Sequence, residues 1–118
     1  MKLPNFEKAK IPKAKITEYL LSFSHRDGRG KAKFFSQFGF SADSWQELAG
    51  ALRQHAVDHE ITKEEKSRFG TRYVIEGKLS TTDGKNPIIR SVWFVPSGEK
   101  NPWFATLRRI LLNGGVHD

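Results

Sequence analysis

The side chains best suited to chemistry in this sequence lie between residues 24 and 35. His25 comes early in that segment, Gly28 and Gly30 follow it, and Lys31 stands in an expected helix. Glycines let a loop turn its backbone N–H groups toward a ligand, and a helix N-terminus favours anions. The pattern therefore indicates a phosphate site that combines an imidazole with an ammonium group. The alternative is a basic surface loop that only caps a short helix.

A second set of cations lies where the sequence alternates like β-strands. Its members are Arg72, Lys78, Arg90, Arg108 and Arg109. Arg72 and Lys78 fall on the same side of their strand, because every second residue faces the same way. Arg90 stands inside an otherwise apolar strand. It is therefore at an edge, paired with a carboxylate such as Glu76, or facing a site.

Length and charge limit the classes of function. The chain has 118 residues and a net charge of +7, which predicts one domain over residues 1–118. Residues 1–40 carry nine Lys/Arg and three Asp/Glu, so the first third favours a polyanion or an acidic protein as partner. The absence of cysteine excludes disulfides, thiolate zinc sites and cysteine nucleophiles. No apolar stretch approaches the ~20 residues of a membrane span, so we expect no membrane contact and a cytoplasmic location.

Apolar spacing predicts helices first and strands afterwards, which is an α+β fold: three N-terminal helices packed on a C-terminal antiparallel sheet of three to four strands. The helices are expected over residues 13–23, 30–38 and 42–57. The strands are expected over 60–65, 71–80 and 88–95, with 103–112 as either a strand or a helix. Lys31 and Lys33 should face solvent, and Asp83-Gly84 should make a tight hairpin turn. Residues 1–12 are expected to form an extended arm and 113–118 a frayed tail.

The same periodicity predicts the hydrophobic core. Its expected members are Ile16, Tyr19, Leu20, Phe23, Phe35, Phe38, Trp45, Leu48, Leu52, Tyr73, Ile75, Ile89 and Trp93. His55 lies on the apolar side of the third helix and is interpreted as a packed core histidine. His59 follows four residues later, so a metal-binding pair is the alternative. Zinc needs three or four ligands and no third is evident, so we expect no metal and no cofactor.

Several motifs resemble a small bacterial family classed as a domain of unknown function. They are Leu3-Pro4-Asn5, Lys15 with Tyr19-Leu20-Leu21, His25-x-x-Gly28-x-x-Lys31-Ala32, Gly39-Phe40-Ser41-Ala42-Asp43, Gly70-x-Arg72-Tyr73-Val74 and Arg90-Ser91-x-Trp93. The family's loop reads His-Pro-x-Gly-x-x-Lys-Ala, and Arg26 replaces its proline here. The resemblance covers roughly residues 3–95, and this chain continues to Leu112 where the family pattern has ended.

The resemblance implies a toxin. Such domains look like products of genes beside a small SH3-like antitoxin-type gene, and like C-terminal cargo of polymorphic toxins. Helices followed by a sheet are also similar to the barnase–EndoU–colicin–RelE group of ribonucleases. A ribonuclease that works without a metal needs a base for the 2′-hydroxyl, an acid for the leaving oxygen, and positive charge beside the phosphorane.

We accordingly expect a metal-independent ribonuclease, with His25 as general base or acid and Lys31 and Arg90 stabilising the phosphate. The residues expected to bind nucleic acid are Arg26, Arg29, Lys33, Arg72 and Lys78. A second hypothesis is a non-enzymatic module that binds RNA, or a small acidic antitoxin-like protein, through the same loop. A third is a structural accessory without a ligand. The sequence leaves the oligomeric state open.

Overall fold

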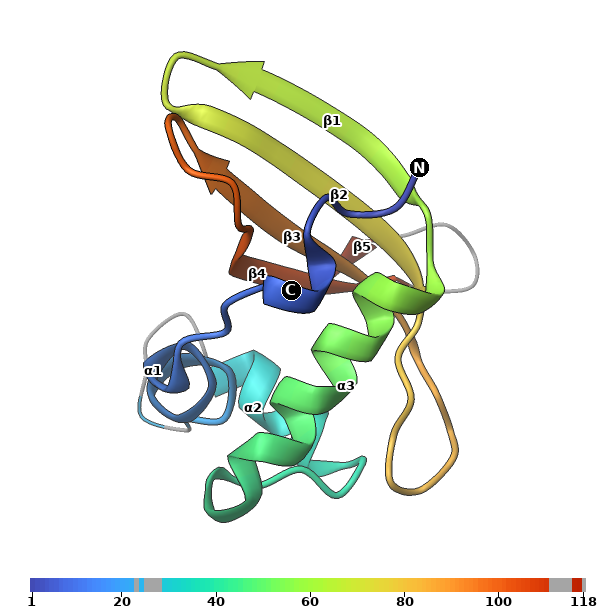
Figure 1. The fold of residues 1–118 in the computed structure, drawn as a ribbon. Coiled ribbons are helices and arrows are strands. Elements are labelled where there is room, and N and C mark those ends of the chain that lie inside the picture. The colour runs from blue at the N-terminus through green and yellow to red at the C-terminus, as the bar shows by residue number, and fades with distance from the viewer. Residues whose placement is uncertain (23, 25–28, 111–115, 118) are drawn as a thin grey trace.

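The computed structural model describes residues 1–22, 24, 29–110 and 116–117. Helical segments occupy the first half of the chain and a meander of antiparallel strands the second half (Figure 1). The α+β class and the C-terminal antiparallel sheet are confirmed. Among the described residues, no helix is long and apolar enough to cross a membrane.

The helical segments are shorter and less regular than the periodicity predicts. They are η1 (Phe6–Lys8), α1 (Lys13–Lys15), η2 (Ile16–Leu20), α2 (Arg29–Ser36), η3 (Ala42–Ser44) and α3 (Trp45–Asp58). η2 is a π-helix, closed by a 2.8 Å bond from the Leu21 N–H to the Ile16 carbonyl. Its wider turn buries Leu21, which an α-helical spacing places off the apolar stripe. The helix expected over 13–23 therefore ends at Leu20.

The sheet places its strands in chain order. They are β1 (Ile61–Ser67), β2 (Gly70–Lys78), β3 (Ile88–Pro96), β4 (Trp103–Ile110) and β5 (Val116–His117). The segment that the sequence left open, 103–112, is a strand over Trp103–Ile110, and its last two residues lie outside the described part of the chain. β5 extends the expected three to four strands to five. β5 also takes Val116 and His117 out of the expected frayed tail, whose other residues lie outside the described part of the chain.

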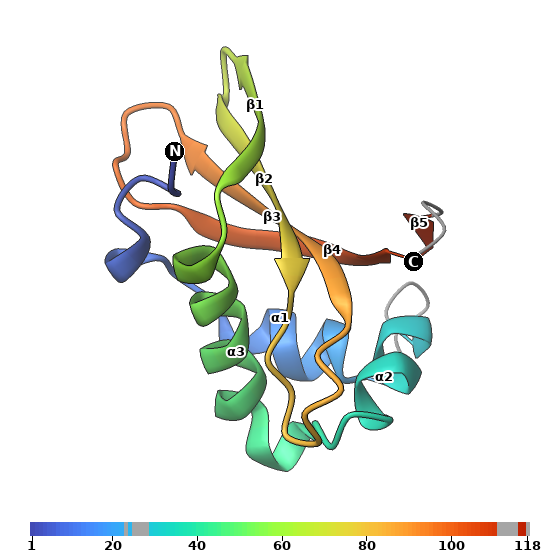
Figure 2. The ribbon, with the colours of Figure 1, turned by 90° about the vertical axis from the view of Figure 1, so that its right-hand side faces the viewer.

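The two faces of the sheet have different chemistry, because residues that pair across antiparallel strands share a face. Tyr73 pairs with Trp93 on the face that α3 covers, while Glu76 pairs with Arg90 on the other. Figure 2 shows the described helices gathered on one side of the twisted sheet. We call the opposite side, which carries Arg72, Glu76 and Arg90, the open face.

The core between the helices and the sheet agrees well with prediction. Nine expected members are buried: Ile16, Leu20, Phe35, Leu48, Leu52, Tyr73, Ile75, Ile89 and Trp93. Tyr19, Phe38 and Trp45 are partly buried against them, and Phe23 lies outside the described residues. The core also contains Leu3, Leu79, Phe104 and Leu107, which the expected list omits. Trp93 and Phe104 meet edge to face, with ring centroids 5.4 Å apart, where β3 and β4 pair.

The first twelve residues are more tightly held than an extended arm implies. Leu3 is buried, and η1 makes a short 3₁₀ turn. The Lys10 N–H donates to the Pro102 carbonyl, and the Phe104 N–H donates to the Lys10 carbonyl, both at 2.8 Å. The arm thus lies along the free edge of β4 as a short parallel bridge.

The β2–β3 connection is a long loop rather than the predicted tight hairpin. Gly84 takes a φ of 74°, as its position in a turn predicts, but the strands stop at Lys78 and Ile88. Thr81 and Asn86 bond to each other across the base of the loop. The Thr82 hydroxyl donates to the Phe38 carbonyl at 2.6 Å and holds the loop against the end of α2.

Candidate functional site

Arg90 lies at the centre of the open face and is paired. Its Nε and Nη2 donate to one carboxylate oxygen of Glu76 at 2.8 and 2.6 Å. Arg108 pairs with Arg90 on the other side, across β3 and β4. Like charges directly opposite each other destabilise a sheet, and Glu76 offsets the charge of Arg90 in this row. Of the three possibilities for Arg90, the ion pair with Glu76 is shown, and the guanidinium also lines a concave surface.

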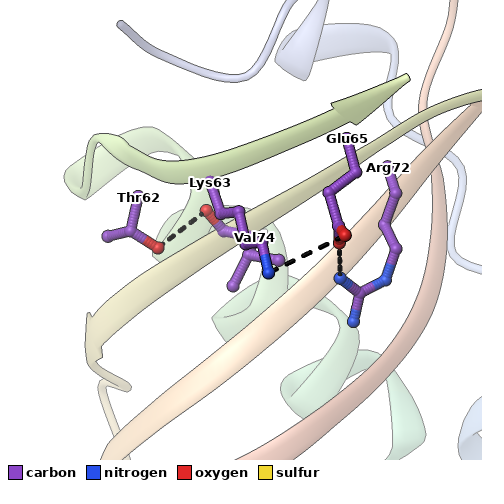
Figure 3. A network of polar contacts seen from close by, with 5 residues as sticks. All are labelled: Thr62, Lys63, Glu65, Arg72 and Val74. Atoms are coloured by element: carbon purple, nitrogen blue, oxygen red, sulfur yellow. Dashed lines mark hydrogen bonds and ion pairs between the residues drawn. The ribbon is translucent and has the colours of Figure 1, made fainter.

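That surface is a hollow of about 290 Å³ on the open face, lined by Thr62, Lys63, Arg72, Val74, Glu76 and Arg90. Figure 3 shows the Glu65 carboxylate between Lys63 and Arg72, two cations that line this hollow. Arg72 donates to Glu65 at 2.5 Å, and the Lys63 ammonium lies 3.7 Å from the other oxygen. The predicted pair Arg72 and Arg90 therefore lines one hollow, with a carboxylate beside each guanidinium.

Lys31 is buried, so the prediction that it faces solvent is wrong. Only 7% of its surface is accessible, and its ammonium lies 5.6 Å from the centroid of the Tyr19 ring. Lys15 approaches the same ring at 5.7 Å and donates to the Ala105 carbonyl of β4. Lys31 lies on the side of α2 that packs against η2, so its side chain is covered by that segment. Burying an ammonium group costs free energy unless the group has partners. Lys31 is therefore held in place by its surroundings and does not move freely in solvent.

Tyr19 connects this cationic pair to the sheet. Its hydroxyl and that of Thr106 lie 3.2 Å apart. Thr106 and Arg108 stand two residues apart on β4, where the pairing with β3 is regular, so they share a face. Side-chain contacts therefore lead from Lys31 through Tyr19 to Thr106, which lies on the face of β4 that also carries Arg108 opposite Arg90. Sequence reasoning missed Tyr19 and Thr106 as site residues, because their roles depend on the register of β4.

The other predicted site residues are divided. His25 and Arg26 lie outside the described residues, and so does the side chain of Arg29, whose backbone opens α2. Lys33 is exposed on α2. Lys78 lies six residues along β2 from Arg72, about 20 Å at the rise of a strand, and lines a different cavity.

His55 is a packed core histidine, as predicted. It is 1% exposed, its Nδ1 lies 3.0 Å from the Ser91 hydroxyl, and its Nε2 lies 3.0 Å from the Gly77 carbonyl. The Trp93 indole N–H donates to the same hydroxyl. A neutral ring satisfies every partner when Ser91 donates to Nδ1 and Nε2–H donates to Gly77. Burial lowers the His55 pKa to about 4, so the ring is neutral at pH 7.

His59 contacts His55 edge to face, with centroids 4.8 Å apart, and its Nε2 lies 2.9 Å from the Lys78 carbonyl. Both rings are thus in hydrogen bonds to the backbone. Within the described part of the chain, no three His, Asp or Glu side chains gather closely enough to hold a metal ion.

A family model matches residues 2–109 under the description "Domain of unknown function (DUF6883)". The chain belongs to the DUF6883 family. The match confirms the resemblance to a domain of unknown function, and it extends through β4, beyond the end that the motifs predicted. No match was found among the curated proteins.

This DUF6883 domain has a similar fold to a chain in a solved structure. That chain belongs to a contact-dependent growth inhibition toxin–immunity protein complex from Klebsiella pneumoniae 342, and the TM-score is 0.70. The similarity covers 88% of this chain and 95% of the other, at 17% sequence identity. At that identity the likeness establishes the fold and leaves the activity to be argued from the residues.

Proposed function

We propose that this DUF6883 protein is a toxin-type ribonuclease that cleaves RNA without a metal ion. The observation that supports the proposal is that Lys31 contacts Tyr19, whose hydroxyl reaches Thr106 on the face of β4 that also carries Arg108 opposite Arg90. Lys31 is six residues from His25 in the sequence. Metal-free RNA cleavage needs these groups to act on one phosphate, and we propose that they do so around the bound RNA.

The chemistry assigns a role to each group. His25, as general base, takes the proton from a ribose 2′-hydroxyl, whose oxygen then bonds to the adjacent phosphorus. The P–O5′ bond breaks, an acid protonates the leaving oxygen, and a 2′,3′-cyclic phosphate remains. Arg90 and Lys31 stabilise the extra negative charge of the phosphorane. Arg26, Arg29, Lys33, Arg72 and Lys78 hold the RNA backbone on either side of the scissile bond.

The charge of the chain and the similar structure support the toxin assignment. The net charge of +7 suits a polyanionic substrate, and the matched fold occurs in a toxin–immunity complex. A toxin of this type acts on the RNA of the target cytoplasm. We therefore place its action there.

Cleavage of a short RNA in EDTA tests the proposal. The wild type should cleave, and His25→Ala and Lys31→Met should each lose roughly 10²–10⁴ in rate. Lys100→Ala, which removes an exposed cation in the β3–β4 turn, is the matched control and should keep full activity. Because Lys31 is buried, the thermal midpoint of its variant is measured alongside. Lowered stability with unchanged cleavage would end the assignment of Lys31 to the site.

RNA affinity should also depend steeply on salt. If the five backbone-holding cations neutralise ~3–5 phosphates, log affinity falls against log salt with a slope near −0.7 for each phosphate. An affinity that stays flat between low and high salt would contradict this mode of binding.

A second candidate is a non-enzymatic module that binds a small acidic protein. The observation in its favour is that the similar fold belongs to one component of a two-protein complex. Induced expression in a bacterial host separates the two candidates. A toxin arrests growth, and a neighbouring acidic gene product rescues it and co-purifies. Normal growth together with co-purification would favour the binding module.

A further inference from the structure

A second cavity lies away from the open-face hollow, between α2 and the β2–β3 loop. It has a volume of about 450 Å³. Phe34 of α2 forms one wall, the loop forms another, and the end of β4 forms the third. The lining residues are Phe34, Lys78, Lys85, Asn86, Pro87, Ile88, Arg109 and Ile110. Figure 2 shows the β2–β3 loop descending beside the helices.

The polar side chains of the cavity can donate hydrogen bonds, and no carboxylate among the described residues lines it. Arg109 Nε is buried without a hydrogen-bond partner among the described residues. No carboxylate in the described part of the chain lies within ion-pair distance of Lys78, Lys85 or Arg109, and Asp83, two residues from Lys85 in the loop, lies outside the cavity lining. Three cations that share one cavity repel one another, and a buried donor without an acceptor is costly. A ligand rich in acceptors and negative charge would relieve both.

The remaining lining of the cavity is apolar. The Arg109 guanidinium lies over the Phe34 ring, 5.3 Å from its centroid, and Pro87, Ile88 and Ile110 complete the wall. Aromatic rings and guanidinium planes are the surfaces on which nucleobases stack. The volume falls within the range of small-molecule sites, about 300–1,000 Å³, and is larger than one carboxylate side chain of a protein partner would fill.

We propose that this cavity is a nucleotide subsite, which stacks one base against the Phe34–Arg109 wall and binds its phosphate between Lys78 and Lys85. Arg109 Nε then donates to an acceptor of the bound nucleotide. The proposal rests on the proposed function for its substrate class, single-stranded RNA. It does not depend on the cleavage chemistry at the open face. It makes the cavity a second point of contact that selects where along a strand the protein binds.

Calorimetric titration of the intact protein tests the subsite. The probes are a nucleoside 5′-monophosphate, the matching nucleoside, inorganic phosphate and a short acidic peptide. The nucleotide should bind at least tenfold more tightly than inorganic phosphate, because base stacking adds to the charge. Equal affinity for phosphate and nucleotide would overturn the base-binding half of the proposal. Tighter binding of the acidic peptide than of the nucleotide would overturn it in favour of a protein-docking site.

Variants locate the binding. Arg109→Met and Lys85→Ala should each weaken nucleotide affinity several-fold, and Lys100→Ala should leave it unchanged. Lys85 is exposed in a loop, so its variant stays informative if Arg109→Met fails to fold. Unchanged affinity in folded Lys85→Ala and Arg109→Met would overturn the subsite.

The two proposals fail in different ways. Nucleotide binding that is lost in the cavity variants, without any RNA cleavage by the wild type, would keep the subsite and remove the ribonuclease. Cleavage with no detectable nucleotide binding at the cavity would do the reverse.

Discussion

The open face and the cavity between α2 and the β2–β3 loop are both rich in cations, but their cations differ in whether a carboxylate is paired with them. On the open face Arg72 is paired with Glu65 and Arg90 with Glu76. In the cavity, no described carboxylate lies within ion-pair distance of Lys78, Lys85 or Arg109. Paired guanidiniums are held in a fixed geometry before a ligand arrives, which suits electrostatic stabilisation of a transition state. Unpaired cations instead gain most when a ligand binds, which suits affinity.

The largest expected difference between the two regions is kinetic. Arg90→Met should lower kcat for RNA cleavage by roughly 10²–10³, because one charge-stabilising donor is removed. Arg109→Met should raise KM and leave kcat nearly unchanged, because it loses binding and not chemistry. Steady-state rates on one short RNA measure both variants. Equal losses of kcat in the two would erase the distinction.

The next effect limits the pH range in which the comparison holds. The pKa of His55 is about 4 in the folded protein, because burial disfavours the charged ring, and 6.5 for an unperturbed histidine in the unfolded chain. The unfolded chain therefore binds the proton first, so stability is complete above pH 6.5 and falls as the pH drops toward 4. The free energy of unfolding should decrease by about 3 kcal/mol over that interval. Denaturant titrations at pH 7 and pH 4 measure the decrease.

A matched pair of variants assigns that pH dependence. His55→Gln should flatten most of it, whereas His59→Gln, at the neighbouring ring, should retain it. If both variants followed the wild type, another group would be responsible.

A smaller effect is expected from a glycine in the β1–β2 hairpin, which supports the open face and not the cavity. Gly70 closes the β1–β2 hairpin at a φ of 146°, and a Cβ there would lie 2.2 Å from the Val95 carbonyl oxygen. Gly70→Ala should therefore cost about 1–3 kcal/mol of unfolding free energy and disturb Arg72, while nucleotide binding at the cavity persists. In α3, nothing lies within 4 Å of a Cβ built at Gly50. Gly50→Ala should therefore raise the free energy of unfolding by up to about 1 kcal/mol, because alanine favours a helix more than glycine does. Chemical denaturation compares the two, and similar costs would contradict the steric argument.

The smallest effect probes the ion pairs themselves. Glu76→Gln should cost about 0.2–1 kcal/mol, since its pair with Arg90 is partly exposed, and the cost should shrink in high salt. Lys85→Ala should change stability by a few tenths of a kcal/mol at most, because no carboxylate is lost. Unfolding curves at low and high salt provide the measurement. A clear salt-dependent loss in Lys85→Ala would show that the cavity cations are paired after all.

The fold was more predictable than the site. Strand alternation placed Tyr73, Ile75, Ile89 and Trp93 correctly, because burial of one face imposes a period of two. Leu21 was missed because the π-turn of η2 departs from the 3.6-residue period. Leu3 was missed because residues 1–12 are expected to form an extended arm, and no local pattern shows where that arm docks. Phe104 and Leu107 were missed because the pattern over 103–112 fits either a strand or a helix, so it does not decide which side chains face inward.

The site depends on the same long-range geometry. The ion pair of Arg90 with Glu76 was one of the outcomes weighed from the sequence, because both stand on neighbouring strands. The burial of Lys31 against Tyr19 was not, since it requires α2 to pack on η2. The opposition of Arg90 and Arg108 requires the register of β3 with β4, including its shift between Val92 and Trp93.

The bridge between the arm and β4 also has a consequence for how the chain folds. Lys10 bonds to Pro102 and Phe104, so a segment that precedes α3 is fixed by one that follows β3. Closing so long a loop carries an entropic cost that local contacts do not repay, and contacts of this kind slow folding. The arm therefore reaches its final position only after the ribosome has released β4. A cell that makes this domain holds an incomplete fold until then, and that interval is when a chaperone or a protecting partner has access to the core.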